Sequence, residues 1–288
     1  MFSILTDSGC DLSAEMLRRL DIKCIPLKLN YPDRSLDIYP DERTICLHDF
    51  YRSMRDGETP KTAAATVEQW MQSAREELQA GNDVIIAPFS SGLSSTFQTA
   101  VMAANELRTE FPKRTVYVSD TRCASLGLGL LLYDAANLRI SGADLTKTIV
   151  FLETRAPQIC HWFTVDNLQY LRRGGRISGA AALAGTVLGI KPILHMDDEG
   201  HLAAVGKKRG RRASLEALAD QLAELAVEPE TQTIFISHGD CEADAKLLEQ
   251  YIRERVSISG CCIHTIGPVI GAHSGPGTVS VFFYGRQR

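Results

Sequence analysis

The segment Asp83-Val-Ile-Ile-Ala-Pro88 is a continuous apolar run, followed closely by the polar turn Ser90-Ser-Gly-Leu-Ser94 and by a helical pattern from about Ser95 to Glu110. An uninterrupted apolar strand of this kind is typical of a parallel sheet that is covered on both faces. Strands and helices alternate around it, at Phe2–Leu5, Ala14–Leu20, Cys24–Leu29, Leu47–Arg55, Thr66–Gln79, Thr115–Val118, Ala124–Ser141 and Leu145–Arg155. The first half therefore predicts a Rossmann-like parallel α/β domain.

The second half has a different pattern. Strands are expected at His161–Val165, Pro192–Met196, Leu202–Lys207, Thr233–Ser237, Cys261–Ile266 and Val279–Tyr284, and helices at Asn167–Leu171, Gly179–Leu188, Ala213–Leu225 and Ala243–Arg255. Two successive strands separated by Asp197-Asp-Glu-Gly200 indicate an antiparallel hairpin. We therefore expect an α/β protein of two domains, with a parallel α/β domain over residues 1–157 and a smaller mixed α+β domain over residues 158–288.

Composition excludes some classes of protein. The 288 residues carry a formal net charge of -4, and a general nucleic-acid binder would normally be basic. The segment Met1–Ser8 lacks the basic stretch of a signal peptide, and the longest apolar run, Ala180–Leu194, is too short for a membrane span and contains Lys191-Pro192. We therefore expect a cytoplasmic protein.

The eight cysteines are scattered and form no C-x-x-C pair. This spacing predicts free thiols and no metal site. Cys261 and Cys262 are adjacent in an expected strand, so their side chains should point to opposite faces of a sheet.

Three polar loops follow expected strands, at Thr6-Asp-Ser8, Ser90–Ser94 and Ser119-Asp120. Ligand groups in parallel sheets gather beyond the carboxyl ends of strands, which favours one shared site. A helix that starts at about Ser95 offers unpaired N–H groups and a positive dipole end, so an anion site is reasonable there. Simple capping of this helix by Ser94 or Ser95 is the structural alternative.

Several catalytic and nucleotide-binding motifs are absent. Ser94 is not in a G-x-S-x-G elbow, and the sequence has no P-loop pattern. Gly127-Leu-Gly129 lacks the third glycine of a dinucleotide site and indicates a closely packed helix face.

Three further segments have both a functional and a structural interpretation. Gly271-Ala-His-Ser-Gly-Pro-Gly277 is expected to be a loop between two strands that either brings His273 to a cleft or exposes it at a turn. Leu171-Arg-Arg-Gly-Gly-Arg-Ile-Ser178 either gathers arginines at a site or ends a helix at Gly174 with solvated arginines. The basic run Gly206–Arg212 is either a solvated surface or a docking site for an acidic partner.

Taken together, these segments resemble the DegV family of bacterial fatty-acid-binding proteins. The resemblance rests on the order and spacing of short pieces along nearly the whole chain: Thr6-Asp-Ser8 with Asp11-Leu12, Pro60-Lys-Thr62, Ser90–Ala100, Ser119-Asp120 with Ser125-Leu-Gly127, Asn167–Ser178, Gly189–Leu194, His238-Gly239 and Ile266–Gly277. It implies a two-domain fold with a long-chain fatty acid in a cavity between the domains. It also implies a partner, an ATP-dependent fatty acid kinase that converts the presented acid to an acyl phosphate for phospholipid synthesis.

The resemblance assigns site residues by position. Thr62 and Ser94 match the residues that hold the carboxylate. Arg176 and His273 match positions beside it, and Gly92 and Leu93, in the same turn as Ser94, are expected to support this polar end. One departure is Ala63-Ala64, where the family usually has Ser-Gln.

We therefore expect a lipid-binding carrier and not an enzyme, with no cofactor or metal beyond the bound fatty acid. The alternatives are a stand-alone serine esterase or acyl transferase that uses Ser94 and His273, and a carrier of another amphipathic lipid.

Overall fold

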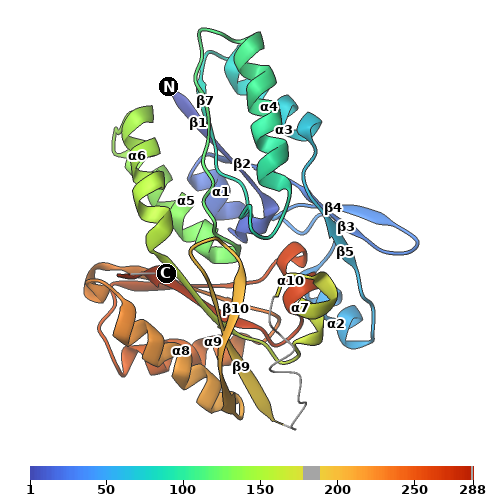
Figure 1. Cartoon of the computed structure of the whole chain (residues 1–288), viewed down its shortest axis with the longest axis vertical. Helices are drawn as coiled ribbons and strands as arrows, with labels where there is room; N and C mark the ends of the chain where they lie inside the picture. The colour runs from blue at the N-terminus through green and yellow to red at the C-terminus, as the bar shows by residue number, and fades with distance from the viewer. Residues whose placement is uncertain (178–188, 287) are drawn as a thin grey trace.

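The computed structural model describes residues 1–177, 189–286 and 288. Its strands form three sheets, and the parallel sheet and the mixed sheet lie at opposite ends of the long axis (Figure 1). The helix expected over residues 179–188 lies outside the described residues. No helix within the described ranges is long and apolar enough to cross a membrane.

The first sheet is parallel throughout, with strand order β2-β1-β6-β7. Its strands are β1 (Phe2–Asp7), β2 (Ile22–Ile25), β6 (Asp83–Ile86) and β7 (Val116–Val118). Helices α3 (Val67–Gln79) and α4 (Thr96–Glu110) cover one face, and α1 (Ala14–Arg19), α5 (Ser125–Ile140) and α6 (Leu145–Arg155) cover the other. Leu5 packs in the first core and Ile4 in the second, which confirms the prediction of a sheet buried on both faces.

The expectation of a single strand over Cys24–Leu29 is wrong, because the chain divides there into two strands. Pro26 separates β2 from β3 (Leu27–Asn30), and proline has no N–H for a sheet ladder. β3 pairs antiparallel with β4 (Ser35–Ile38) and with β5 (Lys61–Ala63), which forms where a loop was expected. This small sheet projects from the side of the molecule, and α2 (Leu47–Arg55) lies between β4 and β5 in the chain (Figure 1).

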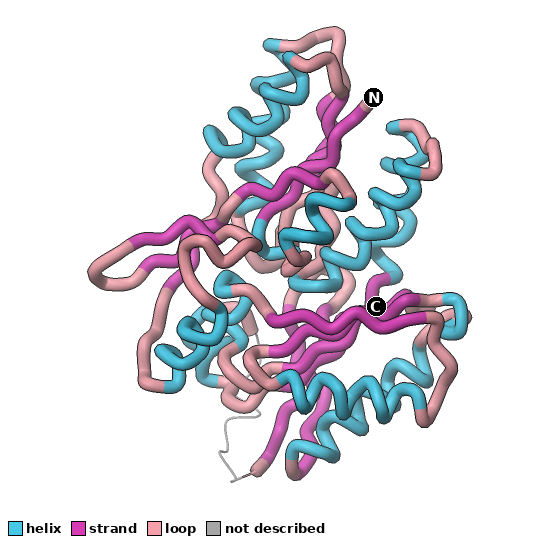
Figure 2. The backbone as a smooth tube through the Cα atoms, turned by 180° about the vertical axis from the view of Figure 1, so that it is seen from behind, coloured by secondary structure: helices cyan, strands magenta, loops and turns pink. Residues whose placement is uncertain are grey.

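The third sheet is mixed, with strand order β10-β9-β8-β13-β11-β12. Its strands are β8 (Ile159–Thr164), β9 (Ile190–Met196), β10 (Leu202–Arg209), β11 (Thr233–His238), β12 (Gly260–Thr265) and β13 (Val279–Tyr284). The pair β11–β12 is parallel and the others are antiparallel, including the predicted hairpin β9–β10. Helices α8 (Arg211–Leu225) and α9 (Glu242–Arg253) cover its outer face (Figure 2).

The inner face of this sheet packs against α5, which therefore lies between the two large sheets. Phe235 and Phe282 of the mixed sheet share one apolar core with Leu128 of α5 and Ile4 of the parallel sheet. The eight cysteines, all of them described, form no disulfide, as predicted. Cys261 and Cys262 point to opposite faces of β12, since each packs against a different core.

The segment Gly271–Gly277 is not wholly a loop, although its glycines suggested one. Pro268–Ser274 forms the helix α10, which has a proline in its first turn, where a missing N–H leaves no helical bond unmade. The short helix α7 (Gln169–Gly174) packs against α10. The described 3-10 turns are η1 (Ser8–Cys10), η2 (Ala156–Gln158) and η4 (Pro229–Thr231).

Candidate functional site

A cavity of about 250 Å³ lies between the parallel sheet and the mixed sheet, and elements of both halves form its walls. Most of the wall is apolar. The apolar lining comes from Leu27, Phe89, Leu93, Phe163, Leu171, Met196, Leu202, Ile266, Val269, Ile270 and Phe282. A largely apolar pocket with a few convergent polar groups is the usual form of a small-molecule site.

The predicted polar residues Thr62, Ser94, Arg176 and His273 all line this one cavity. The closest contact joins Thr62 and His273, whose Oγ1 and Nε2 atoms are 2.7 Å apart. Thr62 lies in the middle of β5, opposite Leu29, and His273 lies near the end of α10. The fold therefore brings together two side chains that are 211 positions apart in the sequence.

His273 occupies space that a glycine leaves open. A Cβ atom at Gly174 would lie 2.2 Å from its Nδ1 atom, so a larger residue at the end of α7 would displace the imidazole. Burial, together with the nearby positive charge of Arg176, lowers the pKa of His273 to about 4. The imidazole is therefore neutral at neutral pH, and Arg176 carries the positive charge beside it.

Arg176 connects α7 to the turn before α4. Its Nε donates to the Leu93 carbonyl oxygen at 3.2 Å, and its Nη1 donates to the Gly174 carbonyl. The helix α7 runs three residues beyond its predicted end at Leu171, and its left-handed cap is Gly175, with φ of 68°, and not Gly174. The helix therefore ends at a glycine cap, and of the three arginines Arg176 lines the cavity, while Arg172 and Arg173 are exposed.

The turn Ser90–Ser94 is held against the β9–β10 hairpin by the Ser90 side chain and by close packing at Gly92. Ser90 Oγ donates to the Gly200 carbonyl at 3.0 Å and accepts from the Gly92 N–H at 3.2 Å. A Cβ atom at Gly92 would lie 2.7 Å from the same carbonyl oxygen, so only glycine fits there. Leu93 follows it into the cavity wall and is buried.

Ser94 lines the cavity and also bonds the start of α4. Its Oγ accepts from the Thr96 N–H at 3.2 Å and lies 2.8 Å from Thr96 Oγ1, so it satisfies a donor at the start of α4. Ser95 occupies the N-cap position without a side-chain hydrogen bond, so of the two candidate residues it is Ser94 that bonds the start of the helix. Ser94 and His273 line one cavity, yet their hydrogen bonds go to Thr96 and Thr62, so they do not form the pair that an esterase would need.

The three polar loops after the parallel strands lie close together, but they do not share the cavity as predicted, because only the turn Ser90–Ser94 lines it. Asp120 accepts from the backbone and side chain of Ser91, and Asp7 accepts from the Phe89 N–H at 2.8 Å. Both carboxylates therefore support the turn that carries Ser94. Burial raises the pKa of Asp7 to about 6.

A buried network of Asp11 and Ser125 beside the cavity was not predicted. Ser125 donates to Asp11 Oδ2 at 2.5 Å, and the Gly267 N–H donates to Asp11 Oδ1 at 2.9 Å. Burial raises the pKa of Asp11 to about 7. Both Asp11 and Ser125 have positive φ values, 53° and 52°, and no sequence signal identifies two such residues as neighbours.

His161 also lines the cavity and was not predicted. Burial lowers its pKa to about 3, and its ring nitrogens are matched to the Ala124 N–H and the Ile159 carbonyl. A Cβ atom at Gly127 would lie 2.2 Å from its Nε2 atom. The predicted close packing at Gly127-Leu-Gly129 therefore makes room for a buried histidine.

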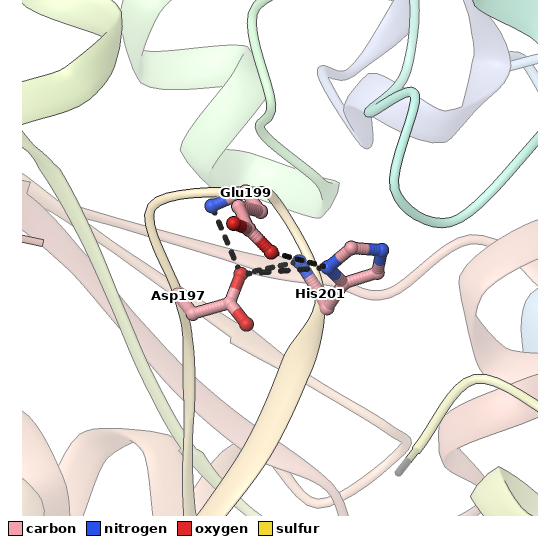
Figure 3. Close-up of side chains that lie close together, drawn as sticks. All are labelled: Asp197, Glu199 and His201. Atoms are coloured by element: carbon pink, nitrogen blue, oxygen red, sulfur yellow. Dashed lines mark hydrogen bonds and ion pairs between the residues drawn. The ribbon is translucent and has the colours of Figure 1, made fainter.

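Asp197, Glu199 and His201 gather at the tip of the β9–β10 hairpin (Figure 3). Asp197 Oδ1 accepts from the backbone N–H groups of Glu199 and His201, at 3.0 and 2.9 Å. These bonds close a polar β-turn and account for the cluster.

Comparisons with known proteins show to which family this chain is similar. The family model described as "Uncharacterised protein, DegV family" matches residues 1–286. A DegV domain-containing protein of Clostridium perfringens is 38% identical over 287 residues, which covers 100% of this chain and 98% of that protein.

Two solved structures share the whole fold. A DegV lipid-binding protein of Thermotoga maritima matches with a TM-score of 0.87 and 30% identity over 100% of both chains. A fatty-acid-binding DegV family protein of Thermus thermophilus matches with a TM-score of 0.88 and 30% identity over 99% of both chains. Sequence and fold agree over the full length, and the chain belongs to the DegV family.

Proposed function

We propose that this protein binds one long-chain fatty acid in the cavity, with the carboxylate held by Thr62 and Ser94. Arg176 and His273 stand beside it, and Gly92 and Leu93 shape the turn that carries Ser94. The observation that supports this proposal is the convergence of these four polar side chains on a cavity whose wall is mostly apolar. The relatives from Thermotoga maritima and Thermus thermophilus, which bind lipid and fatty acid, point to the same class of ligand.

The physical chemistry of the cavity suits an acyl chain. Burial of each methylene contributes about 0.8 kcal/mol, so a sixteen-carbon tail gains on the order of 12 kcal/mol before the costs of association. The tail therefore supplies affinity. The polar end supplies orientation, because a carboxylate accepts charge-assisted hydrogen bonds from hydroxyl and guanidinium donors.

The polar end remains accessible to a partner. Thr62, Ser94 and Arg176 are half-buried, and Ser95, which also lines the cavity, is exposed. We propose that a separate ATP-dependent fatty acid kinase in the cytoplasm reaches the carboxylate here and forms an acyl phosphate. Residues 1–157 would then act as the domain that carries the carboxylate loops, and residues 158–288 as the domain that closes the acyl cavity.

Arg176 would stabilise the negative charge that phosphorylation adds. In a kinase assay on the protein loaded with stearate, Arg176→Ala should lower turnover, while Arg173→Ala, an exposed arginine of the same segment, should not. Full turnover by Arg176→Ala would refute this role.

The basic run offers a surface for the kinase. Lys207, Lys208, Arg209 and Arg212 are exposed, whereas Arg211 is held by Asp244, with 2.9 Å between Nε and Oδ2. Charge reversal at Lys207 and Lys208 should therefore reduce kinase turnover and leave stearate binding intact. If kinase turnover and stearate binding fell equally, the substitutions would have disturbed the cavity, and the docking role of this segment would be refuted.

The first experiment is native mass spectrometry of the purified protein, followed by denaturing extraction and lipid analysis. We expect a stoichiometric fatty acid of 14 to 18 carbons, as the length of a typical membrane acyl chain. The amount of each acid would also show whether Ala63-Ala64 changes the acyl preference. A protein that is empty, and that takes up no added fatty acid, would contradict the proposal.

A further inference from the structure

The helix α10 carries His273 to the polar end of the cavity, although it is too short to be stable alone. It has seven residues, Pro268–Ser274, and no side chain caps its start. Val269, Ile270 and His273 line the cavity. Isolated helices of this length do not persist in water, so the position of α10 depends on the contacts around it.

Two buried side chains from the first half of the chain hold the start of α10. Asp11 Oδ1 accepts from the Gly267 N–H at 2.9 Å. The Tyr51 hydroxyl donates to the Ile266 carbonyl oxygen at 2.8 Å. Asp11 is itself fixed by a second bond, which its Oδ2 accepts from Ser125 at 2.5 Å. The exposed fractions of Asp11 and Tyr51 are 6% and 0%, and neither residue lines the cavity.

Two glycines bring α10 directly against both of these side chains. A Cβ atom at Gly267 would lie 2.8 Å from Asp11 Oδ1. One turn later, a Cβ atom at Gly271 would lie 2.6 Å from the Tyr51 hydroxyl oxygen. The start and the middle of α10 are therefore packed on the first half of the chain without room for a larger residue.

We propose that Asp11 is a positioning residue of the ligand site, which acts through α10 on His273 and does not touch the ligand. This inference rests on the proposed fatty-acid site and adds to it a residue outside the cavity. Without the Asp11 carboxylate, the Gly267 N–H loses its acceptor and the start of α10 is released. His273, near the other end of this helix, then loses the 2.7 Å contact of its Nε2 atom with Thr62 Oγ1. Tyr51 supports the same anchor from α2.

The first readout is NMR of the ligand-free protein. Burial, together with the charge of Arg176, lowers the pKa of His273 from 6.5 to about 4, so the wild-type imidazole stays neutral between about pH 5 and pH 8. In Asp11→Ala we expect this imidazole to lose burial and to titrate within that range. Asp11→Asn keeps both hydrogen bonds and should keep the wild-type titration. Wild-type titration in Asp11→Ala would overturn the proposal.

The second readout is a double-mutant cycle on the dissociation constant of stearate, measured by calorimetry. Asp11→Ala should raise this constant about tenfold, the effect of one lost hydrogen bond to a charged group. In the His273→Ala background it should raise the constant far less, because the residue through which it acts is already gone. Equal factors in the two backgrounds would overturn the proposal. Failure of the wild type to bind stearate would instead overturn the fatty-acid site, and the NMR titration would then decide the role of Asp11.

Asp134→Ala and Tyr284→Phe are the matched controls. Tyr284 donates to Asp134 Oδ2 at 2.8 Å, and this bond joins β13 to α5 through two residues that do not line the cavity. Both variants should lower the thermal unfolding midpoint and leave the His273 titration and the stearate affinity at wild-type values. If Asp11→Ala does not fold, Tyr51→Phe, which removes only the hydroxyl at the start of α10, should show both effects in smaller measure. Wild-type values of Tyr51→Phe in both readouts would then overturn the proposal.

Discussion

At the scale of single residues, the pair of Thr62 and His273 defines the polar end of the cavity. The Thr62 hydroxyl meets a neutral imidazole at 2.7 Å, so it has a partner before any ligand arrives. We expect Thr62→Val, which keeps the shape and removes the hydroxyl, to raise the dissociation constant of stearate about tenfold, the effect of one lost hydrogen bond to a charged group.

Titration calorimetry with stearate measures this effect. Thr62→Ser should restore most of the affinity because it restores the hydroxyl. Thr154→Val, at an exposed position of α6, should bind as the wild type does. Unchanged affinity in Thr62→Val would remove Thr62 from the carboxylate site.

At the scale of elements, the β9–β10 hairpin braces the turn before α4. Arg122 Nη1 donates to the Asp198 carbonyl at 2.8 Å, and Ser90 Oγ donates to the Gly200 carbonyl. The hairpin tip therefore touches two loops of the parallel sheet, and the close approach requires Gly92. A Cβ atom there would meet backbone atoms and not the flexible end of a side chain.

We expect Gly92→Ala to destabilise the fold by about 1–3 kcal/mol, as for other substitutions that force a packed backbone apart. Thermal unfolding should show a lower midpoint, and stearate affinity should fall because Leu93 and Ser94 shift with the turn. Gly206→Ala is the control, since its Cβ would lie 3.7 Å from Ile193, an ordinary contact. Equal thermal unfolding midpoints for the two variants would contradict this prediction, because they would show that the hairpin can move away from position 92 without loss of stability.

At the scale of the whole molecule, Asp11 joins the two halves. It lies after β1 and accepts from the Gly267 N–H, 256 positions away, and from Ser125 at the start of α5. Burial raises its pKa from 3.8 to about 7, so the folded protein binds a proton that the unfolded chain releases in this range. The buried, protonated carboxyl group of Asp11 therefore contributes to the free energy of unfolding. This contribution is present in full below about pH 3.8 and is lost as the pH rises through about 7.

Asp11→Asn removes this dependence, because an amide stays neutral while its oxygen still accepts from Gly267 and its nitrogen donates to Ser125. We expect the stability of the variant relative to the wild type to increase between pH 5 and pH 8, measured by urea unfolding at several pH values. Asn also tolerates the positive φ at this position. Asp33→Asn, an exposed position, should give a difference that does not change with pH, and the same flat result for Asp11→Asn would contradict the buried proton.

Local patterns in the sequence were sufficient for much of the fold. The apolar run at Asp83 and the helix that ends at Glu110 follow from hydrophobicity and turn residues, which act over a few positions. The hairpin at Asp197–Gly200 follows in the same way. Two elements were predicted wrongly. Pro26 divides a strand that was expected to be continuous, and part of a glycine-rich segment that was expected to be a loop belongs to α10.

The sequence by itself determined the alternation of strands and helices and carried the motifs that resemble the DegV family, because both are properties of short segments. Only the tertiary structure decided which polar groups meet. Thr62 and His273 lie side by side because β5 joins the small sheet while α10 packs against α7, and the buried pair of Asp11 and Ser125 needs both halves of the chain. Such contacts depend on the burial and packing of distant segments, which no local pattern encodes.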